Sequence, residues 1–498
     1  MYRNPVNRRD FLQASAAALC AGILGGPPAS ASTDAKSRPN VLFIAVDDLR
    51  PQLGCYGHND IVSPNLDRLA QEGLLFERTY CQQAICMSSR ASLMSGYRPH
   101  KGGLFKNGAL YEHVPDALPV NQHFLNHGYE AVSIGKIFHH RSDEKRGWSR
   151  EAFHPKGDWE GRGYLTPAAI AAVDAYTEAH PNAHRKGLGP AFECAEVPDN
   201  AYADGMIADR AIRELNRLRD QPFFLAVGFK KPHLPFCAPN KYWNLYDPEK
   251  LDLAENPVAP MGAPRSALTT WGELRGYAGM PEDGPMPDGL ARKLIHGYYA
   301  CVSYVDAMAG RVLDELDRLG LRENTIVVLW GDHGWKLGEH GMWCKHTNFE
   351  WDTHVPLIIR APGMKAPGQR TRALTEFVDI YPTLCDLAGL DKPDHLEGLS
   401  MAPLLDDPGR PWKAAAYSQY PRGSTMGYSV RTGRYRYTEW RYAKDTKVRW
   451  RELYDHQEDP AENVNVVPDP ARRAVVERHM ALLRKGFPHI GRQENEEE

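Results

Sequence analysis

The chain has 498 residues and a nearly balanced charge, with 60 Lys and Arg residues against 63 Asp and Glu residues and a formal net charge of -3. This balance excludes a strongly basic protein that binds nucleic acid through its overall field. The hydrophobic fraction of 42% is enough to build one very large core or two unequal ones. Recognition of a partner must therefore depend on a local site.

Residues 1–31 have the pattern of an export signal rather than of folded structure. In the run "NRRDFLQASAAALCAGILGGPPASA", two arginines precede a Phe-Leu pair, a short apolar stretch follows, and small residues at the end offer a cleavage site. This is the arrangement of a twin-arginine signal. An N-terminal membrane anchor is the alternative, but the apolar stretch is shorter than the ~20 residues that span a bilayer and contains Gly and Pro pairs. We expect a periplasmic or secreted protein without membrane insertion.

Eight cysteines remain if Cys20 is removed with this signal, and no Cys-x-x-Cys pair occurs among them. This scatter argues against a zinc site and against a disulfide-dense scaffold. An oxidising compartment permits a disulfide or two, with partners that the spacing leaves open. The eight are Cys55, Cys81, Cys86, Cys194, Cys237, Cys301, Cys344 and Cys385.

Short apolar runs, rich in β-branched and aromatic residues, predict strands that are buried on both faces. They cover residues 41–46, 129–134, 223–228 and 325–330. Helical spacing of apolar residues occurs between them, after Pro64 and from Tyr304 to Gly320. The alternation of strands and helices predicts an α/β fold with a large, mostly parallel sheet sandwiched by helices.

Two long segments, 140–200 and 247–290, are rich in Pro, Gly, Asp and Trp and show little periodicity. We expect them to form loops or insertions over the sheet, where substrate-shaping surface usually lies. After about residue 410, short alternating segments predict antiparallel strands. The sequence thus predicts an α/β domain over 38–410 and a smaller C-terminal α+β subdomain over 411–498.

Polar residues follow each of the four predicted strands, and ligands of open α/β sheets bind at the carboxyl ends of the strands. We therefore expect these residues to converge on one rim. They are Asp47 and Asp48; Lys136, His139 and His140; Lys230, Lys231 and His233; and Asp332 and His333.

The acidic members of this set predict a metal site. Asp47, Asp48 and Asp332 would repel one another unless a cation held them, and oxygen ligands favour calcium or magnesium. A single Asp pair after a strand would more often be a helix cap or a turn. Two such sites, both at strand ends, favour a metal instead.

The basic members suit an anionic substrate group that carries several oxygens. A lone Lys or His would more often be a solvated surface residue, but placement after separate strands favours a common anion pocket. These residues are Lys136, His139, Lys231 and His233.

Cys86 precedes a segment, "SSRASLMSG", that predicts a helix with Ser88 or Ser89 as its N-cap. The cysteine would then lie just before a helix N-terminus, where free N–H groups favour negative charge. It is either an ordinary buried thiol or the precursor of a reactive group.

Taken together, these motifs resemble the formylglycine-dependent sulfatases of the alkaline phosphatase superfamily, and within them the iduronate-2-sulfatase group. The matching segments occur in family order over nearly the whole mature chain. They are "VLFIAVDDLRPQLGCYG", "ICMSSRASLMSGYRP", "SIGKIFHH", "PFFLAVGFKKPHLPF", "LWGDHGWKLGEHGMWCKHTNF", "THVPLI" and "MGYSVRTGRYRYTEW". The resemblance implies an alkaline phosphatase-like fold, sulfuric ester hydrolysis, one Ca²⁺ ion, and a maturation partner, the formylglycine-generating enzyme.

The resemblance also implies roles for individual residues. Cys86, converted to 3-oxoalanine (formylglycine), would be the nucleophile, and Arg90 the cation that steadies it. His233 would protonate the departing alcohol. The implied sulfate-binding residues are Lys136, His139, His233 and Lys345, and the implied metal ligands are Asp47, Asp48, Cys86, Asp332 and His333.

The chain departs from the family pattern at two places. Ser88 stands where the family's Cys-x-Pro-x-Arg motif has Pro, which bears on maturation of Cys86. His346 and Thr347 replace a Tyr-Ser pair of the iduronate enzymes, which bears on the choice of sugar. Trp335 and Trp343 are equally consistent with stacking on a pyranose ring and with core packing.

The sequence predicts an enzyme that removes O-sulfate from a sulfated saccharide, a 2-O-sulfated uronate of a glycosaminoglycan or marine polysaccharide. One alternative is a phosphate or phosphonate monoester hydrolase of the same superfamily. Lys136, Lys345 and a single-metal ligand set fit a sulfatase better, because phosphatases of this type usually need two metals to balance a dianion. The other alternative, if Ser88 blocks maturation, is a sulfated-glycan-binding protein without turnover.

Overall fold

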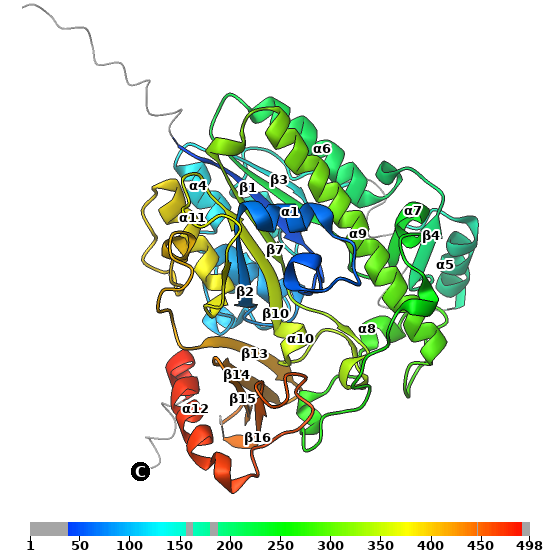
Figure 1. Ribbon diagram of the computed structural model, residues 1–498, viewed down its shortest axis with the longest axis vertical. Helices are drawn as coiled ribbons and strands as arrows, with labels where there is room; N and C mark the ends of the chain where they lie inside the picture. The colour runs from blue at the N-terminus through cyan, green and yellow to red at the C-terminus, as the bar shows by residue number, and fades with distance from the viewer. Residues whose placement is uncertain (1–37, 156–162, 180–187, 446, 491–498) are drawn as a thin grey trace, which may run out of the picture. The chain divides into compact units, whose positions relative to one another are not determined.

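A mixed sheet of eight strands forms the centre of the computed structural model, which describes residues 38–155, 163–179, 188–445 and 447–490 (Figure 1). Its strands are β1 (Asn40–Val46), β2 (Leu74–Tyr80), β3 (Glu130–Gly135), β5 (Phe223–Phe229), β7 (Thr325–Gly331), β10 (His354–Arg360), β11 (Arg370–Thr371) and β12 (Thr375–Glu376). Their order is β11-β2-β10-β7-β1-β5-β3, with β12 also paired to β2. Strands β7, β1, β5 and β3 are parallel, and β10 runs antiparallel to its neighbours β7 and β2.

The four predicted strands are confirmed, with ends that differ by at most one residue from the apolar runs. Strand β1 is buried along its whole length because both faces of the sheet are covered. Val41, Phe43 and Ala45 pack into the core on one face. Leu42, Ile44 and Val46 pack into the core on the other. This explains why the run is continuously apolar rather than alternating.

Helices cover both faces of the sheet, which confirms the predicted sandwich. Apolar residues of α1 (Pro64–Glu72), α6 (Ala203–Leu218) and α9 (Asp288–Arg318) share the core with the even-numbered residues of β1. Those of α2 (Cys86–Ser95), α4 (Val120–Asn126) and α11 (Ile380–Ala388) share the other core. In Figure 1, α6 and α9 lie side by side. Helix α9 begins well before Tyr304, where the sequence predicted its start.

The prediction of an irregular segment over 140–200 is wrong in part. It contains the alanine-rich helix α5 (Pro167–Ala179) and the strand β4 (Phe192–Ala195), which pairs with β6 (Phe236–Pro239). Alanine has the highest helix propensity, which explains α5, whereas the pairing of β4 with β6 depends on residues about 40 positions apart that a local pattern does not connect. The segment 247–290 is mostly irregular, as expected, with two single-turn 3-10 helices and the short helix α8 (Gly272–Arg275) before α9.

Other short α-helices and strands lie in the connections between these elements. They are α3 (Leu110–His113), α7 (Asn240–Trp243), β8 (Lys336–Leu337), β9 (Trp343–Cys344) and α10 (Glu350–Thr353). Among the described residues, no helix is both long enough and apolar enough to span a bilayer. The predicted export signal, 1–31, lies outside the described residues, and all eight cysteines within them are free thiols.

A separate four-stranded antiparallel sheet near the C-terminus confirms the predicted change of pattern after residue 410 (Figure 1). Its strands, in spatial order, are β13 (Ala416–Arg422), β14 (Thr425–Arg431), β15 (Tyr435–Tyr442) and β16 (Val448–Asp455). Helix α12 (Arg473–Gly486) packs against it through Leu483, which shares a core with Val430, Tyr437 and Leu453. The domain boundary at 410/411 stays a prediction.

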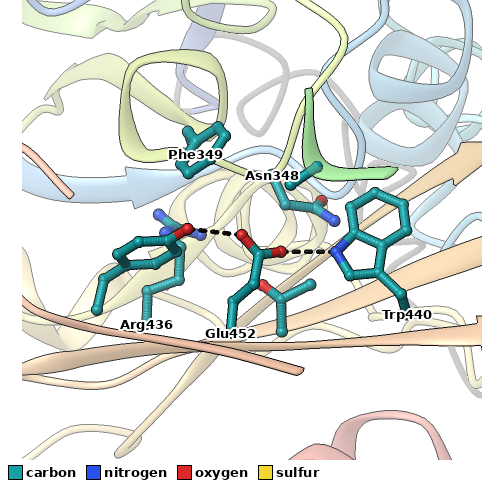
Figure 2. A pocket seen from close by; sticks show the side chains of 8 residues that line it. Asn348, Phe349, Arg436, Trp440 and Glu452 are labelled. Atoms are coloured by element: carbon teal, nitrogen blue, oxygen red, sulfur yellow. Dashed lines mark hydrogen bonds between the residues drawn. The ribbon is translucent and has the colours of Figure 1, made fainter. Parts of the chain in front are cut away.

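A buried carboxyl group lies on this second sheet, at Glu452 of β16. It accepts hydrogen bonds from Trp440 Nε1 at 2.6 Å and from the Tyr454 hydroxyl at 2.7 Å (Figure 2). The group borders a cavity of about 10 Å³, room for one water, that Asn348 and Phe349 close from the other side. Burial raises the pKa of Glu452 to about 7.

Glu452→Gln is expected to stabilise the protein at about pH 8 and to change little at about pH 5. The folded protein keeps a proton that the unfolded chain, with a usual pKa of 4.5, releases as the pH rises towards 7. The wild type therefore loses about 3 kcal/mol of stability across that window, whereas glutamine does not titrate. Thermal unfolding of both proteins at the two pH values measures this, and an equal difference at both would contradict it.

Candidate active site

Two aspartate-containing turns meet at the carboxyl ends of β1 and β7. Val46 lies opposite Gly331 in the parallel register, so the residues that follow are adjacent. Asp332 N donates to Val46 O at 3.1 Å, and Asp48 N donates to the Asp332 side chain at 2.9 Å. Asp48 has a left-handed backbone with φ 60°, which is uncommon for a residue other than glycine. The predicted convergence of Asp47, Asp48, Asp332 and His333 is present, and all four are fully buried.

Cys86 is the first residue of α2 and points at these turns. Its Sγ lies 3.9 Å from Asp48 Oδ1 and 3.1 Å from His333 Nε2. Burial and the Asp47 carboxylate raise the pKa of the thiol well above its usual value. The thiol therefore stays protonated, and a thiolate is not available as an ordinary nucleophile.

The predicted N-cap of this helix is wrong. Helix α2 begins at Cys86, with Ile85 in the cap position, and neither serine caps it. The Ser88 hydroxyl donates to Leu104 O at 2.7 Å, and the Ser89 hydroxyl donates to Asp332 O. The two serine hydroxyls therefore bond to distant backbone carbonyls instead of capping the helix, as the local sequence had predicted.

The cluster offers ligand atoms for a divalent cation: carboxylate oxygens beside an imidazole nitrogen and the side chain of residue 86. Ligand atoms of Asp47, Asp48, Cys86 and His333 all lie within 4.8 Å of one another. His333 donates through Nδ1 to Gly334 O at 3.0 Å, which leaves the Nε2 lone pair facing the cluster, as in a metal-ligating histidine. Burial, with the neighbouring carboxylates, raises the pKa of Asp48 to about 7.

Asp332 adjoins this set, with Oδ1 at 3.6 Å from His333 Nε2. Its other oxygen accepts a hydrogen bond from Arg90 Nε at 2.8 Å. Arg90 also donates to Asp47 at 3.3 Å and to Ile137 O at 3.1 Å, and it is fully buried. One guanidinium on α2 therefore links the two acidic turns.

Lys136 follows β3 at the same edge of the sheet and donates through Nζ to Asp47. Its backbone N donates to Gly228 O at 2.9 Å. Gly135 has φ 75°, and a Cβ there would meet Gly228 O at 2.1 Å, so only glycine allows this close approach. Burial acts to raise the pKa of Asp47, but Lys136 and Arg90 outweigh it and hold the pKa well below its usual value.

Lys345 reaches the cluster from the loop after β9. Its Nζ donates to both oxygens of Asp48, at 2.9 and 3.1 Å, and lies 3.2 Å from the Glu273 carboxylate. An ammonium group thus occupies the space between two carboxylates that a second cation would require. The Trp335 ring lies 5.0 Å from Nζ. Trp335 and Trp343 are 0% and 2% exposed, so core packing, and not stacking on a sugar, describes both.

Of the three other predicted anion-binding residues, His233 lies at the acidic cluster, His139 lies at the exposed rim, and Lys231 is directed elsewhere. His233 Nε2 lies 3.2 Å from Glu273 and 3.9 Å from Asp48, and Nδ1 donates to Leu234 O at 2.6 Å. Burial and the Lys345 charge lower the pKa of His233 to about 4. His139 is exposed at the rim, with its ring against His140. Lys231 instead turns its Nζ onto the carbonyl oxygens of His233 and Pro235, at 3.1 and 2.6 Å.

Glu273 is a site residue that the sequence did not indicate. It belongs to α8 in the irregular segment 247–290, where no strand end or periodicity marks it. Its carboxylate meets Lys345, His233 and also His346, whose Nε2 lies 3.3 Å away. His346 Nδ1 lies 2.7 Å from the Tyr420 hydroxyl of β13. The C-terminal sheet therefore contributes directly to the surroundings of the site.

The loop that carries Lys345 and His346 is fixed to that sheet at its far end. Glu350 accepts hydrogen bonds from Arg431 Nε at 3.0 Å and from Arg436 Nη2 at 2.5 Å. The Glu350 backbone N donates to Glu462 at 2.7 Å. We call Glu350, Arg431, Arg436 and Glu462 the loop clamp.

Comparison with known proteins gives consistent matches over most of the chain. A family model described as sulfatase matches residues 39–390, and one described as N-sulphoglucosamine sulphohydrolase, C-terminal, matches residues 338–486. Human iduronate 2-sulfatase is 34% identical, with 91% of this chain and 94% of that protein covered.

Solved structures show the same fold. A structure in complex with D-glucosamine-2-N,6-O-disulfate has a TM-score of 0.72 at 23% identity and covers 91% of this chain and 98% of its own. A phosphonate monoester hydrolase of Agrobacterium radiobacter has a TM-score of 0.72 at 23% identity, with 91% and 96% covered.

Arg90→Ala is expected to lower the free energy of unfolding by about 3–5 kcal/mol, because it leaves buried carboxylates without their shared partner. Arg68→Ala is the matched control, since Arg68 pairs with Asp314 at the surface and its loss should cost less than about 1 kcal/mol. Urea or thermal unfolding measures both. Equal losses in the two variants would show that Arg90 does not hold the acidic turns together.

Proposed function

We propose a substrate for this chain, which belongs to the sulfatase family and is a sulfuric ester hydrolase. The enzyme removes the O-sulfate of a 2-O-sulfated uronate in a glycosaminoglycan or marine polysaccharide. The observation that carries this proposal is the buried cluster in which the Cys86 Sγ lies 3.9 Å from Asp48 Oδ1, with Lys136 and Lys345 on adjoining carboxylates. Similarity to iduronate 2-sulfatase over 91% of the chain supports the uronate. Twin-arginine export would place the enzyme with extracellular polysaccharides.

The nucleophile we propose is Cys86 after conversion to formylglycine by the formylglycine-generating enzyme. The hydrated aldehyde supplies one hydroxyl that attacks sulfur and a second that allows sulfate to be expelled. The position of residue 86 at the N-terminus of α2, against Asp48 and His333, supports this assignment, because free helix N–H groups favour developing negative charge.

We propose one Ca²⁺ ion, held by Asp47, Asp48, Asp332, His333 and the modified residue 86. When bound, the ion would offset the negative charge that gathers as an anionic nucleophile meets an anionic ester. Arg90 fixes two of these ligands, Asp47 and Asp332, before any substrate enters. Such preorganisation means that little reorientation is needed during reaction.

The remaining groups act on the ester itself. Lys136, Lys345 and the exposed His139 would bind the sulfate oxygens. As the bond between sulfur and the sugar oxygen breaks, His233 would give its Nε2 proton to that oxygen, which leaves as an alcohol. In the free site the pKa of His233 is about 4. A bound sulfate raises it, because an adjacent negative charge favours the imidazolium form.

The main alternative is a phosphate monoester hydrolase. Lys345 bridges Asp48 and Glu273 where a second cation would need to lie, and this favours one cation and a monoanionic ester. The fold shared with a phosphonate monoester hydrolase does not separate the two reactions, because fold alone does not set chemistry.

Peptide mass spectrometry of the exported protein should show formylglycine at position 86, and Cys86→Ala should lower sulfate release by at least about 10³-fold. Ser88→Pro restores the family motif that the formylglycine-generating enzyme reads, so it should raise the converted fraction of Cys86. The variant should still fold, because proline is tolerated in the first helical turn. Only unmodified thiol in both proteins, after co-expression with the formylglycine-generating enzyme, would contradict the proposed nucleophile. Affinity for sulfated glycans without sulfate release would instead identify a binding protein.

Ion chromatography of sulfate released from defined sulfated oligosaccharides tests the substrate. Uronate 2-O-sulfates are expected to react faster than hexosamine 6-O- or N-sulfates. Nitrophenyl sulfate and nitrophenyl phosphate, compared in the same assay, separate a sulfatase from a phosphatase. Sulfate release from other positions but from no uronate 2-O-sulfate would remove the proposed substrate and leave the chemistry intact.

Removal of the metal with a chelator is expected to abolish turnover and to lower the melting temperature, because an ion that binds only the folded protein stabilises it, and its loss leaves Asp47, Asp48 and Asp332 with their side-chain partners alone. Added Ca²⁺ should restore both. Thermal unfolding with and without chelator gives a readout that does not depend on turnover. A melting temperature that does not change would count against a bound cation.

A further inference from the structure

Glu273 places a negative charge among the groups that we propose to hold the sulfate. Its carboxylate oxygens lie 3.2 Å from Lys345 Nζ, 3.2 Å from His233 Nε2 and 3.3 Å from His346 Nε2. One of its oxygens also lies within 4.8 Å of the Asp48 carboxylate. An acidic side chain in this position opposes the binding of any anion, so its presence needs an explanation.

The segment around Glu273 is built to hold it there. Leu274 is 1% exposed, and Trp271, also buried, has a left-handed backbone with φ 43°, which is rare for a bulky residue. The Arg275 guanidinium lies 3.3 Å from the centre of the Trp271 ring. Arg275 further fixes the segment by donating to three carbonyl oxygens, those of Thr270, Pro281 and Gly284.

Glu273 is ionised in this position. Burial acts to raise its pKa, but the Lys345 charge and the hydrogen bonds from His233 and His346 outweigh burial and hold the pKa well below its usual value. Burial also lowers the pKa of His346. Glu273 therefore cancels a unit of positive charge beside Lys345.

Two other charged groups near Glu273, the Lys336–Asp352 pair and Arg422, do not neutralise the Glu273 carboxylate. Lys336 pairs with Asp352 at 2.5 Å, so this pair contributes no net charge. Arg422, from β13, donates to the backbone carbonyls of His346 and Ser266, so its guanidinium is directed to backbone oxygens and not to Glu273. The net charge at the sulfate end of the site is thus sensitive to Glu273.

We infer that Glu273 is a specificity-determining residue that favours monoanionic esters over dianionic ones. This inference rests on the proposed function. A sulfate monoester and a phosphate monoester have nearly the same tetrahedral shape, so pocket shape separates them poorly. They differ by one negative charge near neutral pH, and that extra charge meets the Glu273 carboxylate in a buried site, where charge repulsion is strong.

Glu273→Gln, made in the full-length, matured enzyme, tests the inference. The value of kcat/KM for nitrophenyl phosphate, divided by that for nitrophenyl sulfate, should rise at least about tenfold, because one unit of repulsion near the dianion is removed. The same ratio for a nitrophenyl phenylphosphonate, a monoanion with a phosphorus centre, should change less than about twofold. This substrate separates an effect of charge from an effect of phosphorus chemistry.

Two further variants control the experiment. Glu282→Gln removes a carboxylate from the exposed part of the same segment and should change no ratio. Glu273→Asp keeps the charge and should keep the wild-type preference. If Glu273→Gln slows all three substrates equally and leaves the ratios unchanged, Glu273 only positions Lys345 and His233, and the inference is wrong.

Calorimetric binding gives a readout without turnover. Inorganic sulfate is a dianion and methyl sulfate a monoanion, so Glu273→Gln should tighten the first at least about tenfold more than the second. Equal tightening would overturn the inference. If the wild type releases sulfate from no ester, the proposed function fails, while the two binding affinities still decide the role of Glu273.

Discussion

Repulsion between buried carboxylates is the constraint on which this structure depends. Asp47, Asp48 and Asp332 lie together with no exposed surface, and an unpaired buried charge costs several kcal/mol. Each is balanced by a cation from a different part of the chain: Arg90 from α2, Lys136 from the end of β3 and Lys345 from the loop after β9. The positions of these three segments are therefore set by charge as much as by apolar packing.

Sequence reasoning located the parts of the site that follow strands. Continuous apolar runs predicted β1, β3, β5 and β7, and the rule that ligands bind at strand ends then brought Asp47, Lys136, His233 and Asp332 to one edge. The sequence did not predict Glu273, because its position depends on how an irregular insertion folds back over the sheet. The direction of Lys231 escaped it too, since spacing along a chain does not show which carbonyls a flexible side chain will reach.

Strained backbone is concentrated around the same cluster. Asp48, Cys344 and His346 all have positive φ, and none is glycine. Such conformations cost about 1–3 kcal/mol each and persist where surrounding contacts determine them. Asp48 is held by its hydrogen bond to Asp332, and His346 by Tyr420 and Arg422. At these residues the placement of charged groups outweighs the backbone's preference for negative φ, which is typical of functional sites.

The loop clamp has a consequence for biosynthesis. The loop that carries Lys345 and Glu350 can reach its clamp only when Arg431 and Arg436 have been translated, and the strands that contain them are among the last parts of the chain to leave the ribosome. Residue 86 becomes inaccessible once α2 packs, since it is only 4% exposed in the folded protein. An enzyme that modifies this side chain must act on the nascent or unfolded polypeptide.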